Sequence, residues 1–230
     1  MPKDSIVIGV DGCSGGWLCF KLNLQSRQTE VKVHCSFADV ISEIQSAKLS
    51  AVDIPIGLPD SSSRDCDLNA RRQLGKPRST SVFPPPVRSA LNAMNYQQAC
   101  ALNRKACGKA LTKQTYAICK KILEVDMLMS QKEQSRIYEV HPEVCSWALN
   151  GFVSMRYSKR KAEGHRDRQK LLSFQYPEIK QHVSQLVRRE ARADDLLDAA
   201  AAAWTAERIA KGKATHIPTN PQLNRKRLRM

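Results

Sequence analysis

Short apolar runs separated by polar turn residues occupy the N-terminal part of the chain. Runs rich in β-branched residues and bounded by turn residues are typical of buried strands, and apolar residues at every third or fourth position are typical of a helix. The first three runs are joined by short connections, which favours antiparallel neighbours. The pattern predicts strands at residues 6–10, 16–22 and 30–35, a helix at residues 37–46 and a strand at residues 49–52. This order predicts a mixed α/β fold.

Helical patterns dominate the rest of the chain. Proline and glycine at residues 55–59 predict a loop, and the proline-rich residues 79–88 predict a stiff extended segment. One more strand is expected at residues 136–140. Helices are expected at residues 65–74, 89–104, 113–130, 144–149, 165–174, 178–189 and 195–211. We therefore predict a single domain over residues 1–230, with residues 60–135 as a helical insertion between two strands of one sheet.

The composition is that of a protein with a sizeable core, because 42% of the 230 residues are hydrophobic. No apolar run approaches the roughly 20 residues of a membrane span, and residues 1–5 lack the apolar core of a leader peptide. We therefore expect a cytoplasmic protein without membrane contact. The eight cysteines include no Cys-x-x-Cys pair, so we expect reduced thiols and no structural zinc site.

The net charge of +15 is concentrated in two segments. Residues 151–192 carry 11 basic and 4 acidic side chains, and residues 208–230 carry 7 basic and no acidic ones. Residues 193–207, between them, carry four acidic side chains and no basic one. An acidic cluster flanked by basic segments fits a polyanion such as DNA or RNA as the partner, although a solvated basic surface would give the same composition.

Acidic residues occur where predicted elements end or begin. Asp11 and Asp53 each follow a buried strand, and Asp195 and Asp198 lie three residues apart on one face of an alanine-rich helix. Four carboxylates that meet at one edge of a sheet would repel one another without a cation, and their hard oxygen ligands suit Mg²⁺ or Mn²⁺.

Each of these acidic residues also has a structural interpretation. An aspartate at a strand end often forms a turn, and aspartates in the first turn of a helix compensate its dipole and cap it. Glu139 lies in a strand-like run shortly before His141 and Glu143. Glu139 could serve as a further catalytic or ligating carboxylate, or simply hydrogen-bond at the strand end.

Several longer motifs resemble, in order, a family catalogued as domain of unknown function 429. They are Val-Asp-Gly-Cys-Ser-Gly-Gly-Trp at residues 10–17, Val-Asp-Ile-Pro-Ile-Gly-Leu-Pro at residues 52–59, Ser-Val-Phe-Pro-Pro-Pro-Val-Arg at residues 81–88, and shorter segments at residues 111–114, 121–126, 139–143 and 194–199. Members of this family are usually described as predicted RNase H-like nucleases.

The resemblance implies an RNase H-like core, with three antiparallel strands, a helix, and then parallel strands alternating with helices. It also implies that Asp11 and Asp53 match the acids of the first and fourth strands of that superfamily. Asp195 and Asp198 are similar in placement to two acids on the last core helix of the RuvC resolvase. Glu139 matches only a motif of the family.

The leading hypothesis is a divalent-metal-dependent nuclease in which Asp11, Asp53, Asp195 and Asp198 bind Mg²⁺ or Mn²⁺ for phosphodiester hydrolysis. In this hypothesis the basic segments 151–192 and 208–230 hold the nucleic acid. One alternative is a nucleotide-binding enzyme of the actin and sugar-kinase group, although such enzymes need a second core and 230 residues leave little room for it. Another is an inactive nucleic-acid-binding protein that has kept the fold.

Overall fold

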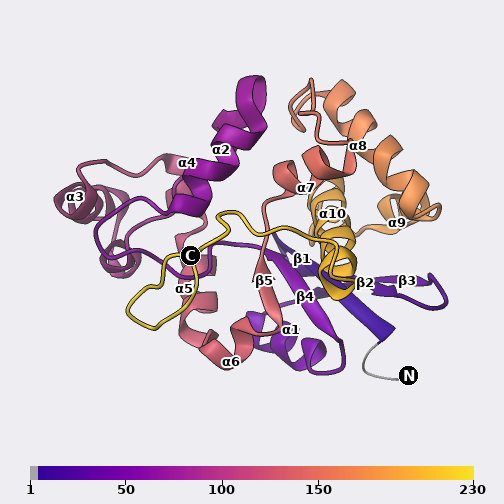
Figure 1. The fold of residues 1–230 in the computed structure, drawn as a ribbon, viewed down its shortest axis with the longest axis horizontal. Helices are drawn as coiled ribbons and strands as arrows, with labels where there is room; N and C mark the ends of the chain where they lie inside the picture. Colours follow the sequence, from indigo (N-terminus) through magenta and orange to yellow (C-terminus); the bar gives the residue numbers. More distant parts are fainter. Residues whose placement is uncertain (1–4) are drawn as a thin grey trace.

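The computed structural model of the chain describes residues 5–230 (Figure 1). The expectation that there is no leader peptide was based on residues 1–5, and residues 1–4 lie outside the described range. The strands are β1 (Ile6–Cys13), β2 (Gly16–Asn23), β3 (Thr29–His34), β4 (Leu49–Asp53) and β5 (Ile137–Glu139). They form one five-stranded sheet in the order β3-β2-β1-β4-β5. Strands β1, β2 and β3 pair antiparallel, whereas β4 and β5 pair parallel to β1 and β4, respectively. The predicted mixed α/β sheet is confirmed.

Helices cover both faces of the sheet. On one face α1 (Phe37–Ile44) and α5 (Cys119–Leu128) pack against Ile8, Val10 and Val52. On the other face α10 (Ala193–Ala210) lies across the sheet (Figure 1), and α8 (Ala162–Gln175) and α9 (Ile179–Gln185) add to the same apolar cluster. None of the helices within residues 5–230 has the length and apolar composition needed to cross a membrane.

Helical segments fill the chain between β4 and β5. They are α2 (Asp65–Arg78), the 3-10 helices η2 (Ser79–Ser81) and η3 (Arg88–Asn92), α3 (Tyr96–Cys107), α4 (Lys113–Ala117), α5 and α6 (Gln131–Gln134). After β5, α7 (Pro142–Leu149) leads towards the second face of the sheet. Regular helical geometry in α2 is interrupted at Gly75, close to the predicted end of this helix.

The predicted extents of three helices are wrong. Residues 89–104 divide into η3 and α3, because Asn95 caps a new helix by accepting a hydrogen bond from the Gln98 N–H at 2.9 Å. Residues 113–130 divide into α4 and α5 at Ile118, whose backbone leaves the helical region. Residues 178–189 keep a helix only as α9, because the backbone is extended at Leu186.

The contact between α10 and β1 fixes the position of the last helix. Gly9 lies in β1 beneath the alanine run 199–203, whose residues are at most 2% exposed. A methyl group at Gly9 would lie 2.0 Å from the Ala199 carbonyl oxygen and 2.2 Å from the Ala203 nitrogen. Backbone therefore meets backbone here, because neither element carries a large side chain at the contact.

Replacing Gly9 should consequently displace α10. We expect Gly9→Ala to lower the free energy of unfolding by roughly 3 kcal/mol or more, because the clash is with backbone atoms that cannot rotate away. Urea unfolding followed by circular dichroism measures the loss. Gly12→Ala is the matched control, since its methyl group would meet only the flexible Lys121 side chain, at 2.8 Å. Equal unfolding midpoints for Gly9→Ala and the unmodified chain would contradict this account of the contact.

Candidate functional site

Asp11 and Asp53 lie side by side on neighbouring parallel strands. Asp53 is the last residue of β4, whereas Asp11 lies within β1, which continues beyond the predicted residues 6–10 to Cys13. In the register of β1 and β4, their Cα atoms are direct partners. Side chains alternate along a strand, so Asp11 shares a face with Val7 and Gly9, and this is the face that α10 covers. The backbone of a five-stranded sheet thus holds two carboxylates next to each other.

A third carboxylate comes from α10. Because Gly9 lets the helix approach closely, Asp198 in its second turn reaches the two strand ends. One carboxylate oxygen from each of Asp11, Asp53 and Asp198 can be chosen such that all three lie within 4.8 Å of one another. We call these three residues the aspartate cluster. The side chain of Asp198 is only 4% exposed.

The aspartate cluster concentrates negative charge in a poorly solvated place. Burial raises the pKa of Asp11 well above its usual value, and the charges of Asp53 and Asp198 raise it further. Burial and the charge of Asp198 likewise raise the pKa of Asp53 to about 8. Protons therefore occupy part of the cluster near neutral pH when no cation is bound.

Lys159 supplies the one side-chain cation that forms an ion pair with the aspartate cluster within residues 5–230. Its ammonium contacts the Oδ2 atom of Asp198. Burial disfavours the charged ammonium, but the charges of Asp198 and Asp11 outweigh burial and raise the pKa of Lys159. The lysine side chain remains 39% exposed, so it is accessible to solvent as well as to the acids. From the sequence, Lys159 is expected only as one residue of the basic segment 151–192 that would hold a nucleic acid.

Asp195 is held one helical turn earlier, outside the group of three. Its Oδ2 atom accepts a hydrogen bond from the Arg192 N–H at 2.8 Å, so it caps the start of α10. Its charge still acts on the cluster, since it contributes to the raised pKa of Asp11. The turn between β1 and β2 holds the segment just before this cap in place, because the Gly15 N–H donates to the Glu190 carbonyl oxygen at 2.7 Å.

Glu139 belongs to a separate ion pair. The guanidinium of Arg64, itself 1% exposed, donates to both carboxylate oxygens of Glu139 at 2.7 and 2.8 Å. The Ile56 N–H donates to the same carboxylate at 2.7 Å, which secures the loop that follows Asp53. Arg64 also forms a two-point ion pair with Asp67. Glu143 is likewise engaged, with Arg168 at 2.7 Å.

In two further groups of potential metal ligands, a basic side chain of the protein already pairs with the carboxylates. One group consists of Cys66, Asp67 and Glu139, and the buried guanidinium of Arg64 pairs with both of its carboxylates. The other consists of Cys19, His34 and Glu43, and Lys21 pairs with Glu43 at 2.9 Å. Moving Arg64 away to admit a metal ion would leave two carboxylates without a counter-charge. The aspartate cluster is therefore the strongest candidate metal site in the described part of the chain.

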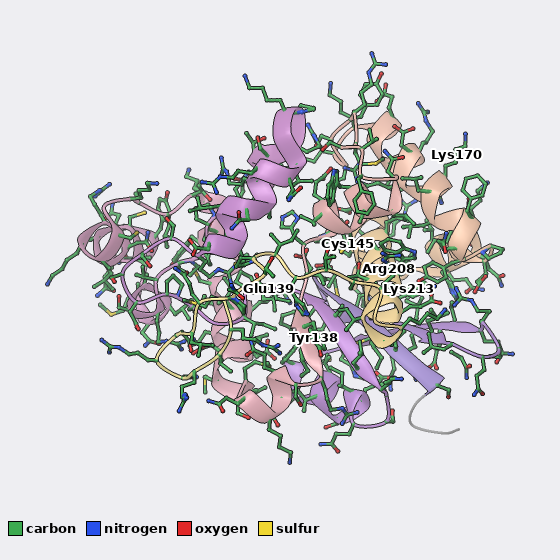
Figure 2. All side chains as sticks on the ribbon, viewed as in Figure 1. Tyr138, Glu139, Cys145, Lys170, Arg208 and Lys213 are labelled. Carbon is green, nitrogen blue, oxygen red and sulfur yellow. The ribbon has the colours of Figure 1, made fainter. Side chains whose placement is uncertain are left out.

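Some of the basic residues are used within the fold. Arg225 pairs with Asp60 at 3.1 Å and Lys226 with Asp126 at 3.2 Å, and these two pairs fasten the C-terminal segment to the core. Lys211 pairs with Glu207 at 2.6 Å, one turn earlier along α10. Figure 2 shows Lys170 at the periphery on α8, and Arg208 and Lys213 near the C-terminal end of α10. Within segment 151–192, the exposed basic side chains without an ion-pair partner in the described residues are Arg156, Arg160, Lys161, Arg166, Lys170, Lys180 and Arg188.

Comparison with known proteins gives one match. The profile of the family described as "Protein of unknown function (DUF429)" matches residues 9–223. No curated protein and no solved structure shows significant similarity to the chain. The matched range includes every residue of the aspartate cluster.

The raised pKa of Asp53 makes the stability of the metal-free protein depend on pH. Because the folded chain binds this proton up to about pH 8 and the unfolded chain only to about pH 4, the free energy of unfolding falls as pH rises between these values. Asp53→Asn removes the ionisation. With EDTA present, we expect this variant to melt at least about 2–4 °C above the unmodified chain at about pH 8, and to match it at about pH 4.

The control for this prediction is Asp194→Asn, which alters a half-exposed aspartate paired with Arg192 on the surface. It should leave the pH dependence of the melting temperature unchanged. Thermal unfolding across this pH range measures both variants. A melting temperature of Asp53→Asn that runs parallel to that of the unmodified chain at every pH would refute the prediction.

Proposed function

The chain belongs to the DUF429 family, and we propose that it is a divalent-metal-dependent nuclease that hydrolyses phosphodiester bonds of nucleic acids. The observation that carries the proposal is the aspartate cluster, formed by two parallel strand ends and one helix. Residues from three distant parts of the chain would gain nothing in packing from bringing buried carboxylates together. Holding a cation offsets the cost of their repulsion.

The donor set fits Mg²⁺ or Mn²⁺. Both ions prefer hard oxygen ligands, and magnesium sites in proteins commonly combine one or two carboxylates with water and substrate phosphate oxygens. Asp11, Asp53 and Asp198 would hold the ion directly, and Asp195 would add negative charge from the preceding turn of α10. Burial and the charges of Asp53 and Asp198 raise the pKa of Asp11, although Lys159 lowers it in part, and a bound cation would offset these effects.

A bound divalent ion would supply Lewis-acid activation of the phosphodiester and of the attacking water. The chain's own contribution is to fix three carboxylates on rigid elements, so that little reorganisation is needed. Lys159 balances part of the charge of Asp198, and the ammonium of its partly exposed side chain would be free to contact a phosphate oxygen if a metal ion took its place. Glu139 acts through Arg64 and Ile56, by holding the loop after Asp53.

The arrangement of the sheet supports an RNase H-like core. Three antiparallel strands are followed by a helix and then by strands parallel to the first, as the resemblance implies. The acids of the first and fourth strands are the ones that meet. Among the exposed basic residues of segment 151–192, Arg166 and Lys170 lie on α8, which packs with α10, and this puts positive charge on the helical layer that carries Asp198.

Removal of a cluster carboxylate should abolish cleavage. We expect Asp11→Asn and Asp198→Asn each to lower Mn²⁺-dependent cleavage of labelled DNA and RNA oligonucleotides by at least about a hundredfold, because an amide cannot replace an anionic ligand. Cleavage is measured on denaturing gels, with an EDTA sample as the blank. Asp194→Asn, on the same helix but outside the cluster, should cleave as the unmodified chain does. Full cleavage by Asp11→Asn would falsify the proposed function.

Lys159 gives a second test, because it occupies the position of a counter-ion. With EDTA present, Lys159→Gln should unfold at a lower temperature, with a loss of about 1–2 kcal/mol, since Asp198 loses its partner. Mn²⁺ should then raise the melting temperature more in the variant than in the unmodified chain, because the ammonium no longer competes. Lys161→Gln, an exposed residue two positions away, is the control. An equal Mn²⁺ response in all three proteins would rule out this role.

A further inference from the structure

A pocket opens beside Asp53, on the β5 side of the aspartate cluster. Its volume is about 330 Å³, within the range of sites that hold small molecules. The walls come from β5, α2, α7, the second half of α10 and residues 214–230, which pass over the edge of the sheet (Figure 1). We call it the Asp53 pocket. Asp53 is therefore shared between this pocket and the cluster.

Aromatic side chains form much of the pocket wall. They are Phe83, Tyr138, Trp147, Phe152 and Trp204. The rings of Trp147 and Phe152 pack edge to face, with their centroids 5.0 Å apart. Phe152 is 62% exposed and Phe83 is 41% exposed, although large aromatic residues normally bury their rings. Exposed rings at a pocket beside a catalytic centre are suited to contact the flat face of a ligand.

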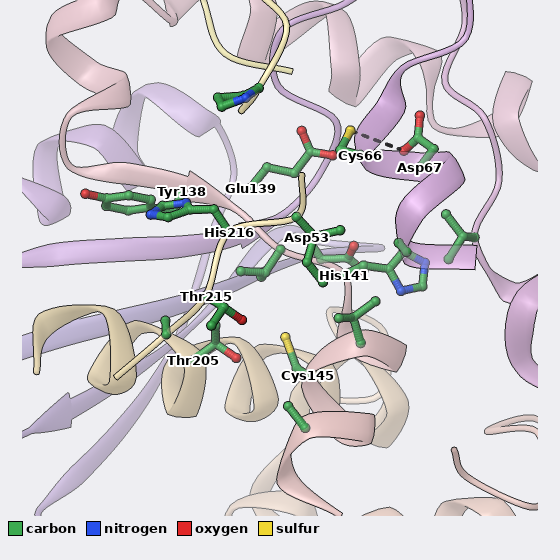
Figure 3. Close-up of a pocket in the computed structure, with 18 of the residues that line it drawn as sticks. Asp53, Cys66, Asp67, Tyr138, Glu139, His141, Cys145, Thr205, Thr215 and His216 are labelled. Carbon is green, nitrogen blue, oxygen red and sulfur yellow. Dashed lines mark hydrogen bonds between the residues drawn. The ribbon is translucent and has the colours of Figure 1, made fainter. Parts of the chain in front are cut away.

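Polar groups lie among these rings. Figure 3 shows Asp53 and Glu139 reaching the pocket from the sheet, Thr205 from α10, and His216 from the C-terminal segment. The Glu139 carboxylate is held in place by Arg64, so its orientation is fixed before any ligand arrives. Flat apolar walls combined with fixed donors and acceptors match a heteroaromatic ring that carries hydrogen-bonding edges.

Besides Arg64, two more guanidinium groups line the pocket. Arg208 lies over the Trp204 ring at 4.9 Å from its centroid and donates to the Lys213 carbonyl oxygen at 2.6 Å. Arg229 lies 5.9 Å from the centroid of Tyr138. Neither arginine forms an ion pair with an acid in the described residues. The pocket thus combines ring-binding surfaces with positive charge, as an anionic ligand with an aromatic part requires.

Resting on the proposed nuclease function, we propose that the Asp53 pocket binds one unpaired nucleobase of the strand whose phosphodiester reaches the aspartate cluster. A base in a duplex is stacked on both faces and paired at its edge, so it cannot enter such a pocket without being extruded. The substrate class that follows is single-stranded nucleic acid, or a duplex with an unpaired nucleotide.

The proposal is tested by binding without cleavage. Full-length protein is titrated in EDTA into fluorescein-labelled oligonucleotides of one sequence, either single-stranded or as a blunt duplex, and fluorescence anisotropy is followed. We expect the single strand to bind at least tenfold more tightly than the duplex. Phe152→Ala should reduce single-strand affinity about fivefold or more, since stacking of a base contributes that much, and leave duplex binding unchanged.

Phe174→Ala is the matched control, because Phe174 is 74% exposed on α8 and does not line the pocket. Ala148→Phe provides a second variant, which fills the pocket and should weaken single-strand binding in the same way. Equal affinities for single strand and duplex would overturn the proposal, as would a loss in Phe174→Ala that equals the loss in Phe152→Ala.

Competition with nucleoside monophosphates distinguishes a strand from a free nucleotide. The proposal predicts that the oligonucleotide binds at least a hundredfold more tightly than any monophosphate, because neighbouring phosphates contact basic residues. Comparable affinities would overturn it and assign the pocket to free nucleotides. Mn²⁺-dependent cleavage is measured separately. Cleavage without a pocket effect refutes only the pocket proposal, whereas pocket-dependent binding without cleavage refutes the nuclease.

Discussion

Electrostatic repulsion within the aspartate cluster is the constraint around which this structure is organised. The three carboxylates are largely buried, and one oxygen of each lies within 4.8 Å of the others, so they resist ionisation. Burial and the neighbouring negative charges raise the pKa values of Asp11 and Asp53. The fold nevertheless brings them together, because the strand register fixes two of them and the contact of α10 with Gly9 fixes the third. Packing energy that is spread over a large helix–sheet contact therefore holds a local arrangement that is unfavourable by itself.

The parts of the site that sequence reasoning predicted are those that depend on local pattern. Asp11 and Asp53 could be identified because each comes directly after an apolar run, and the carboxyl ends of parallel strands lie at the same edge of a sheet. Asp198 could be paired with Asp195 by helical spacing, but spacing alone cannot tell which of the two meets the strands. The rotation of α10 decides this, and the backbone N–H of Arg192 makes Asp195 a cap.

Other parts depend on contacts between distant residues and leave no pattern in the sequence. Lys159 reaches Asp198 from a loop 39 residues away, and Arg64 joins Glu139 from 75 residues away. Nothing in the composition around either residue marks these pairings. The split of the predicted helices at Asn95 and Ile118 has a different, local origin, because apolar spacing continues through residues at which capping or backbone geometry ends the helix.

Basic residues of the C-terminal segment have two different roles, which the composition alone cannot distinguish. Ion pairs of Arg225 with Asp60 and of Lys226 with Asp126 hold it on the fold, so these charges are partly neutralised. Arg208 and Arg229 instead line the Asp53 pocket and keep their charge available. The segment thus completes the wall of the pocket that begins at Asp53. In the proposed function, a nucleic acid strand attracted by the exposed basic residues near α8 would meet carboxylates and aromatic rings at one place, so that cleavage and the selection of an unpaired nucleotide would both depend on Asp53.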